Sequence, residues 1–257
     1  MGRIKLGICQ KSLGLPFRRS LAAARQLGVA GLELEASGEL APANLTQTGR
    51  REILHLLRSD DLTVSAIYCP LRRGIDVALN LEPRLEYIRD TMQLAFDLGP
   101  RLVIVPIGQL PQKDDDPASA VFLESLRDLG QHGDRTGVTI ALDNSGDSPE
   151  SLVAYLGRFD TGSLAVIYNP ANLVLAGFNP FDAIKTLNKR LVYAQAQDAR
   201  RVSPSRLAAV PLGHGDIDWM NLLAHFEVID YRGALTVLGN DHAELATGVA
   251  FLRRFVA

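Results

Sequence analysis

Residues 164–172 read Leu-Ala-Val-Ile-Tyr-Asn-Pro-Ala-Asn, a run of five largely apolar side chains that stops at Asn169-Pro170. An unbroken apolar run of this length is typical of a parallel strand that is covered on both faces. An Asn-Pro pair marks a turn, because proline disfavours continuation of regular structure on its N-terminal side. Residues 164–172 therefore predict one strand of a parallel sheet that ends in a polar turn.

Similar apolar runs recur along the chain and make eight in all. They are Ile4–Cys9, Leu32–Ala36, Thr63–Cys69, Leu102–Ile107, Val138–Asp143, Leu164–Tyr168, Leu191–Gln195 and Ala234–Leu238. Between them apolar residues recur with the 3.6-residue period of a helix, as in 81–95, 121–129 and 245–256. This alternation predicts an α/β protein in which each strand is followed by a helix.

The expected helix ends agree with this alternation. Asp116-Pro117 and Ser148-Pro149 each combine an N-cap residue with a proline at the first helical position. Glycines 28, 99, 130 and 137 fall where helices are expected to end or where the next strand begins. Eight such units without a linker predict a single (β/α)8 TIM barrel of eight parallel strands over residues 1–257. A doubly wound sheet is the alternative, but residues 7–11 supply no glycine-rich phosphate turn.

Composition narrows the possible partners. The 257 residues are 47% hydrophobic and 22% charged, which is enough apolar sequence for one large core. The chain has 27 basic and 29 acidic side chains, which gives a formal charge of −2. Neither nucleic acid nor a membrane is expected as a partner. Cys9 and Cys69 lie in apolar runs and are expected to be buried thiols of a reduced compartment. The start of the chain lacks the apolar block of a signal peptide, so a cytoplasmic protein is expected.

Polar side chains gather at the expected C-terminal ends of the strands, where barrels of this kind carry their chemistry. They are Glu33, Glu35, Tyr68, Asp143, Asn144, Asn169, Gln195, Gln197 and Asp198, with Asn172 and His214 in the following turns. Hydrogen-bonding groups are unfavourable in a packed core, so they are not expected at these positions unless the positions face a polar space. The strand ends therefore predict a polar and mostly neutral mouth.

The order and spacing of several motifs in residues 138–255 resemble the xylose isomerase-like family, the sugar phosphate isomerase/epimerase group. The motifs are Asp143-Asn144, Asn169-Pro170-Ala171-Asn172, Tyr193–Ala199, Gly213–Trp219 and Gly233–Leu238. The first half matches more loosely, through 31–34 and 94–99. The resemblance implies a barrel fold and isomerase or epimerase activity on a sugar.

The same resemblance implies a divalent metal held by Glu, Asp, His and Glu from strands five to eight. The matching positions here are Asp143, Asn169, Gln195 and Leu238. One carboxylate, two amides and an alkyl group remain, and transition metals prefer imidazole, thiolate or carboxylate ligands. We therefore expect no metal and no other cofactor. The ordinary metal-stabilised enediolate mechanism is expected to be impaired.

Asp143 and His214 are the expected catalytic residues, because histidine titrates near neutrality and Asp143 is the acid left in the ancestral metal set. The expected sugar- or polyol-binding residues are Glu33, Tyr68, Asn144, Asn169, Asn172, Gln195 and Gln197. Each has a plain structural alternative: Asp143 could bond backbone, the two glutamines could bond each other, and His214 could be a solvated loop residue. The arginines at 72, 73 and 84 could meet a substrate phosphate or only solvent.

Three functions stay open at this point. The first is an enzyme acting on a sugar or polyol, with an altered or lost metal requirement. The second is a non-catalytic relative that binds a carbohydrate or a protein partner. The third is an endonuclease of the related abasic-site family, which would need a multi-zinc ligand set and a basic face that this sequence lacks. A homo-oligomer is neither required nor excluded.

Overall fold

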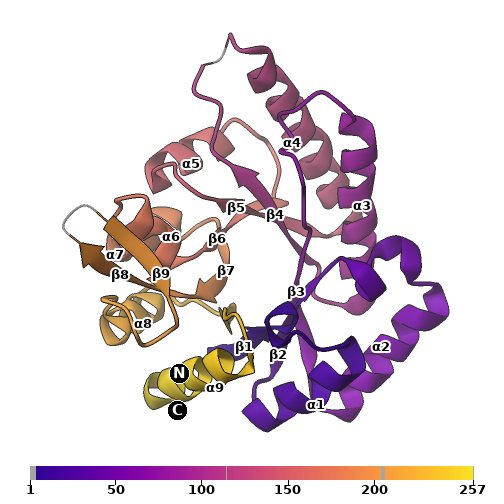
Figure 1. Cartoon of the computed structure of the whole chain (residues 1–257). Helices are drawn as coiled ribbons and strands as arrows, with labels where there is room; N and C mark the ends of the chain where they lie inside the picture. Colours follow the sequence, from indigo (N-terminus) through magenta and orange to yellow (C-terminus); the bar gives the residue numbers. More distant parts are fainter. Residues whose placement is uncertain (1–3, 114, 204–205, 257) are drawn as a thin grey trace.

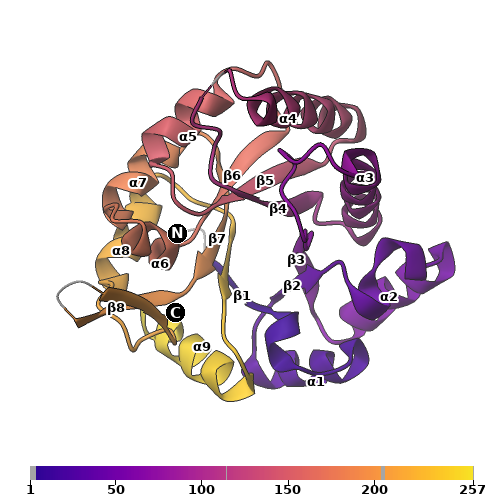
Figure 2. The ribbon, with the colours of Figure 1, turned by 45° about the horizontal axis from the view of Figure 1, so that its top comes forward.

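The fold is a closed barrel surrounded by helices (Figures 1 and 2). The computed structural model describes residues 4–113, 115–203 and 206–256. Within these residues, parallel strands close in the order β1-β10-β7-β6-β5-β4-β3-β2. These strands are β1 (Lys5–Cys9), β2 (Gly31–Glu35), β3 (Thr63–Tyr68), β4 (Leu102–Gly108), β5 (Thr139–Asn144), β6 (Leu164–Tyr168), β7 (Leu191–Ala196) and β10 (Ala234–Val237). The predicted (β/α)8 barrel is confirmed, and each predicted run agrees with a strand to within one residue at either end.

Helices connect consecutive strands on the outside of the barrel. They are α1 (Phe17–Leu27), α2 (Gln47–Ser59), α3 (Leu81–Leu98), α4 (Pro117–Thr136), α5 (Pro149–Leu156), α6 (Pro170–Leu175), α7 (Pro180–Leu187), α8 (Trp219–Val228) and α9 (His242–Val256), with short 3-10 turns η1 (Gln10–Leu13), η2 (Gly38–Leu40) and η3 (Pro42–Asn44). The two predicted N-caps are confirmed: the Asp116 carboxylate accepts from the N–H of Ala118, and the Ser148 hydroxyl accepts from the N–H of Ser151. No helix among the described residues is long and apolar enough to cross a bilayer.

Gly130 is not at a helix end, so that prediction was wrong. It lies inside α4 and is buried against β6 and the turn before it. A Cβ at this position would stand 3.1 Å from Cγ2 of Thr161 and 3.3 Å from Cγ of Leu164. The glycine is therefore explained by close packing of a helix on the barrel. Glycines 28, 99 and 137 do follow helices, as predicted, and the structure shows that all three have positive φ.

A hairpin that the sequence did not predict follows β7. Strands β8 (Asp198–Ser203) and β9 (Arg206–Val210) pair antiparallel as a separate two-stranded sheet. Figure 1 shows this hairpin projecting beside α6, and both of its strands contact that helix. The chain therefore carries an extra element next to the C-terminal ends of the barrel strands.

The hydrophobic core lies in two layers. The larger layer fills the space between helices and strands, and it includes the largest buried side chains of α4 and α8. The smaller layer is made by strand residues alone: Ala66, Leu102, Ile104, Ala141, Ile167 and Tyr193. This second cluster comes from inward-facing positions of adjacent strands and fills part of the barrel interior. Cys9 and Cys69 are free thiols within the strand region.

Candidate active site

A cavity of about 520 Å³ is formed at the C-terminal ends of the barrel strands. The barrel itself, the η1 turn, the β8–β9 hairpin and the segment after β10 all contribute to its walls. Seven of the nine predicted site residues line it: Glu33, Tyr68, Asp143, Asn169, Asn172, Gln195 and Gln197. The structure thus gathers most of the polar strand ends around one space large enough for a sugar-sized molecule.

Glu33 of β2 is the most deeply buried acid of the cavity, with 3% of its surface exposed. Its carboxylate accepts a 2.9 Å hydrogen bond from Nε2 of Gln195 on β7, across the barrel. Burial raises the pKa of Glu33 to about 7. Hydrogen bonds from Gln195 and from the Tyr193 hydroxyl oppose this rise, and the charge of Asp143 adds to it. Glu33 is therefore partly protonated at neutral pH.

Asp143 at the end of β5 is a carboxyl group without a hydrogen-bond or ion-pair partner among the described residues. It is partly buried and lines the cavity, and none of the described residues donates a hydrogen bond to it. Burial raises the pKa of Asp143 to about 6. The alternative that Asp143 serves the backbone at the barrel mouth finds no support in these contacts. It is available to a molecule bound in the cavity.

Asn169 at the end of β6 has a structural role as well as a place in the cavity wall. Its Oδ1 caps α6 by accepting from the N–H groups of Ala171 and Asn172, at 3.0 and 3.3 Å. Its Nδ2 donates to Oε1 of Gln197 at 3.3 Å. The Asn-Pro turn is thus also the start of a helix, and the amide oxygen of Asn169 is already committed to backbone donors.

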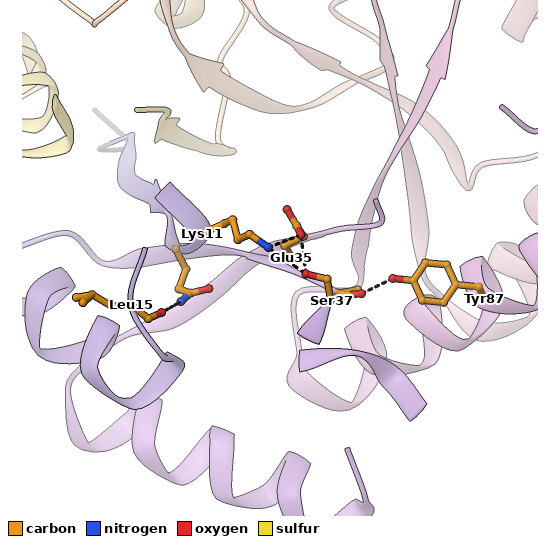
Figure 3. Close-up of polar contacts among 7 residues, drawn as sticks. Lys11, Leu15, Glu35, Ser37 and Tyr87 are labelled. Atoms are coloured by element: carbon orange, nitrogen blue, oxygen red, sulfur yellow. Dashed lines mark hydrogen bonds and ion pairs between the residues drawn. The ribbon is translucent and has the colours of Figure 1, made fainter. Parts of the chain in front are cut away.

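Lys11 and Glu35 form an ion pair at the edge of the cavity. The Lys11 ammonium in η1 lies 2.9 Å from Oε1 of Glu35, which also accepts from the Ser37 hydroxyl (Figure 3). Burial opposes ionisation of Glu35, but the hydrogen bonds from Ser37 and Lys11 outweigh it and lower its pKa. Glu35 was expected at the mouth from sequence, because it lies at the end of the same strand as Glu33, two residues on, and so shares its face. Lys11 is carried by a local turn that gives no such signal.

Asn144 and His214 do not line the cavity. Asn144 donates to the carbonyl of Gly108 and to the carboxylate of Asp147, and so holds the loop between β5 and α5. His214 is exposed, in a turn closed by the bond from its own N–H to the carbonyl of Pro211. The expected pairing of His214 with Asp143 over one ligand therefore has no basis in this geometry.

Several cavity residues were not predicted from sequence. Ala209, Val210 and Pro211 come from the β8–β9 hairpin and its exit, and Glu244 comes from the first turn of α9. The one available signal for the hairpin was the turn-forming run 203–205 between two short segments of strand-like residues. The glutamate at 244 has no strand-end signature, because it reaches the cavity from a helix.

Comparison with known proteins agrees with this architecture. A sequence profile described as xylose isomerase-like TIM barrel matches residues 21–255, which is most of the chain. The chain belongs to this family. The earlier resemblance, which rested mainly on residues 138–255, therefore extends over nearly the whole barrel.

Individual relatives of this family member are distant. An uncharacterized protein of Methanocaldococcus jannaschii is 22% identical over 185 residues, and the match spans 67% of this chain and 62% of that protein. A xylose isomerase domain protein from Planctomyces limnophilus superimposes with a TM-score of 0.82 at 20% identity, over 91% of each chain. A 3-keto-D-glucoside 4-epimerase from E. coli gives 0.79 at 16% identity, over 98% of this chain and all of that one. At these identities the structural likeness concerns the fold.

The residues of this family member do not fit the metal site that the resemblance implies. Asp143, Asn169, Gln195 and Leu238 all line the cavity, but the Asn169 oxygen is used by the cap of α6. Gln195, whose Nε2 donates to Glu33, offers a neutral amide oxygen in place of an imidazole nitrogen. Leu238 offers no donor atom at all. Among the described residues no group of three or more His, Cys, Asp or Glu is placed to hold a metal ion. This donor set suits neither a divalent metal of the family type nor a multi-zinc endonuclease centre.

Proposed function

We propose that the protein binds a sugar or polyol in the cavity at the mouth of its barrel and transfers a proton on it without a resident divalent metal. The residue proposed to move the proton is Asp143. The proposal accounts for a polar cavity in an isomerase-like barrel whose metal positions no longer supply a ligand set. It goes beyond the fold, which the family alone accounts for.

The unpartnered carboxyl of Asp143 is the observation that carries this proposal. A carboxyl with a pKa of about 6 is ionised at pH 7 but is a stronger base than an ordinary aspartate. It lines the cavity, and none of the described residues takes up its oxygens. The surrounding amides of Gln195 and Gln197 are groups that both donate to and accept from sugar hydroxyls.

The chemistry at Asp143 would start with removal of a proton from a carbon next to a carbonyl of the ligand. The carboxylate gains that proton, and the negative charge moves to the carbonyl oxygen of an enediolate. Return of the proton by Asp143 to the neighbouring carbon gives isomerisation. Epimerisation would need a second acid to protonate the opposite face of the same carbon, while Asp143 keeps the proton that it removed. In metal-dependent enzymes the cation stabilises the enediolate, so this protein needs another source of positive charge or hydrogen bonds.

Asp143→Asn should lower kcat by about 100-fold or more on any sugar that is turned over, because the amide cannot accept the proton. KM should change much less, since an amide keeps the shape and a hydrogen-bonding oxygen. The measurement is NMR-monitored exchange of carbon-bound hydrogen for deuterium across a panel of aldoses, ketoses and cyclitol ketones. Asp90→Asn on the exposed side of α3 removes the same charge far from the cavity and should leave exchange unchanged. Equal exchange in wild type and Asp143→Asn would disprove the assignment.

The protein should hold no stoichiometric zinc or manganese at Asp143, Asn169 and Gln195 after dialysis, as measured by elemental analysis. The quadruple change Asp143→Glu, Asn169→Asp, Gln195→His and Leu238→Glu should create metal affinity, because it rebuilds three carboxylates and one imidazole. Asn169→Asp preserves the cap of α6, since aspartate caps equally well. Zinc that survives dialysis in the wild type and is lost in Asp143→Ala would contradict the proposal.

A ligand-binding protein without turnover is the second candidate. Leu238 favours it, because this position supplies no carboxylate for a second proton-transfer step at the end of β10. The two candidates differ in one result: a sugar that stabilises the protein but shows no hydrogen exchange under any condition indicates binding alone.

A further inference from the structure

The cavity carries an excess of acidic groups. Glu33, Glu35, Asp143 and Glu244 line it, against a single cation among the described lining residues, Lys11. Lys11 is already bound to Glu35 at 2.9 Å. Three carboxyl groups are therefore left without a cationic partner.

These three carboxyl groups find only neutral hydrogen-bond donors or none. Glu33 accepts from Gln195, and Glu244 accepts from the backbone N–H and side-chain amide of Asn240. Asp143 accepts from none of the described residues and is partly buried. A buried carboxylate is stable when it is paired with a cation or fully hydrogen-bonded, and Asp143 is neither. The cavity therefore has fewer positive than negative groups, and a positively charged ligand would correct this imbalance.

The arginines that could have met a substrate phosphate are used elsewhere. Arg84 donates to the backbone carbonyls of Gly74, Val77 and Leu79. Arg72 and Arg73 do not line the cavity, and neither does any other arginine that the structure describes. Phosphate sites in proteins are usually built from arginine, lysine or helix N-termini. The expectation that 72, 73 and 84 could bind a substrate phosphate therefore has no support here.

We propose that the ligand of this cavity is a hydroxylated molecule that carries an ammonium group and no phosphate or carboxylate, with the ammonium facing Asp143 and Glu33. This inference rests on the proposed function, since it names the class of sugar or polyol. An anionic group would enter a cavity where like charges raise its free energy, whereas an ammonium donates charge-assisted hydrogen bonds to carboxyls that lack a cation. Affinity is expected to be highest for the amine, lower for the neutral sugar or polyol, and lowest for the anion.

Such a ligand also supplies what the lost metal no longer provides. The enediolate formed by proton removal needs positive charge near its oxygen, and Lys11 is held by Glu35 at the edge of the cavity (Figure 3). An ammonium on the carbon beside the reacting one would lie next to that oxygen. The ligand itself would then stabilise the negative charge, and the positions of Asn169, Gln195 and Leu238 would be free to lose their metal-binding groups.

The test uses two sets of probes, each with one cationic, one neutral and one anionic member on the same six-carbon framework. D-glucosamine, D-glucose and D-glucuronate share a ring, and D-glucamine, D-glucitol and D-gluconate share an open chain. Dissociation constants are measured by NMR titration at pH 7.5 and low salt, where charge effects are least screened. The amine of each set should bind about 10-fold or more tightly than its neutral counterpart, and the acid should bind more weakly than both.

The variants Glu33→Gln and Asp143→Asn, singly and together, test whether the selectivity comes from these carboxyls. In the double variant the ratio of neutral to amine dissociation constants should fall to about one, whatever the change in the affinity for the neutral probe. Glu86→Gln, on the exposed side of α3, is the matched control for loss of one charge and should keep the full ratio. Should the double variant fail to fold, Glu244→Gln at the cavity rim should reduce the ratio in part.

The outcomes separate this inference from the function on which it rests. No binding by any of the six probes would count against the proposed function itself. Binding without charge order, tighter binding of an acid, or an amine preference that survives in the double variant would overturn the ammonium proposal and leave sugar binding intact.

Discussion

Asp198→Ala should destabilise the protein by about 3–5 kcal/mol, the loss expected when a buried charged acceptor is removed from several donors. Asp198 is 1% exposed. Its Oδ1 accepts from the N–H groups of Ala199 and Ile217, at 2.9 and 3.3 Å. Its Oδ2 accepts from the N–H of Gly213 at 3.1 Å and from Nε1 of Trp219 at 3.3 Å. One carboxylate thus ties the start of the β8–β9 hairpin to the segment that returns to α8.

The measurement is urea unfolding of wild type, Asp198→Ala, Asp198→Asn and the control Asp216→Ala. Asparagine keeps one acceptor oxygen, so the free energy of unfolding of Asp198→Asn should lie between those of Asp198→Ala and wild type. Asp216 is exposed in the same loop and accepts one backbone bond, from Arg201, so its removal should change the free energy of unfolding by about 1 kcal/mol or less. A free energy for Asp198→Ala within 1 kcal/mol of wild type would show that the loop is held by other contacts.

The contacts of Asp198 also illustrate why the sequence predicted the barrel but not the β8–β9 hairpin. The eight barrel strands are short apolar runs because both faces of a parallel strand are covered, and this leaves a local signal in the sequence. Strand β8 has two buried residues followed by four exposed ones, β9 mixes exposed and half-buried residues, and among the described residues the two strands pair with each other alone. Their position depends on hydrogen bonds that Gly213 and Trp219 donate to Asp198, and such tertiary bonds leave no periodic pattern in the sequence.

The candidate site was predictable to the extent that it uses strand ends. Glu33, Asp143 and Gln195 were placed correctly because the C-terminal ends of parallel barrel strands meet at one mouth. Residues on loops and helices did not follow this rule, and His214 illustrates the failure. Its glycine-flanked turn is adjacent to the buried Asp198, yet the backbone bond to Pro211 leaves the imidazole exposed. The side-chain direction in a turn is set by backbone geometry that the motif does not reveal.

The stability of the unliganded protein should fall as pH rises from about 5 to 8 because of Glu33 and Asp143. Burial raises the pKa of Glu33 from 4.5 to about 7, so between these values the folded protein binds more protons than the unfolded chain. Stability then decreases with increasing pH and levels off once Glu33 is ionised in both states. Asp143 acts in the same direction, with a pKa raised from 3.8 to about 6. The contribution of Glu33 is on the order of 3 kcal/mol.

Glu33→Gln isolates this contribution, because glutamine is neutral at every pH and its oxygen can still accept from Gln195. The difference in the free energy of unfolding between variant and wild type should change by a few kcal/mol in favour of the variant between pH 5 and pH 8. Glu86→Gln, which removes an exposed carboxylate from α3, should give a difference that stays nearly flat. A flat difference for Glu33→Gln as well would mean that Glu33 is ionised in the folded protein throughout this range.

The two acids should also depend on each other. The charge of Asp143 contributes to the raised pKa of Glu33, so Asp143→Asn should lower the pKa of Glu33 and shrink the effect of Glu33→Gln at pH 8. At that pH the double variant should therefore gain less free energy of unfolding than the two single variants gain together. Strictly additive changes in the free energy of unfolding would mean that burial alone destabilises each carboxylate. A cation in the cavity would then have no repulsion between Glu33 and Asp143 to relieve.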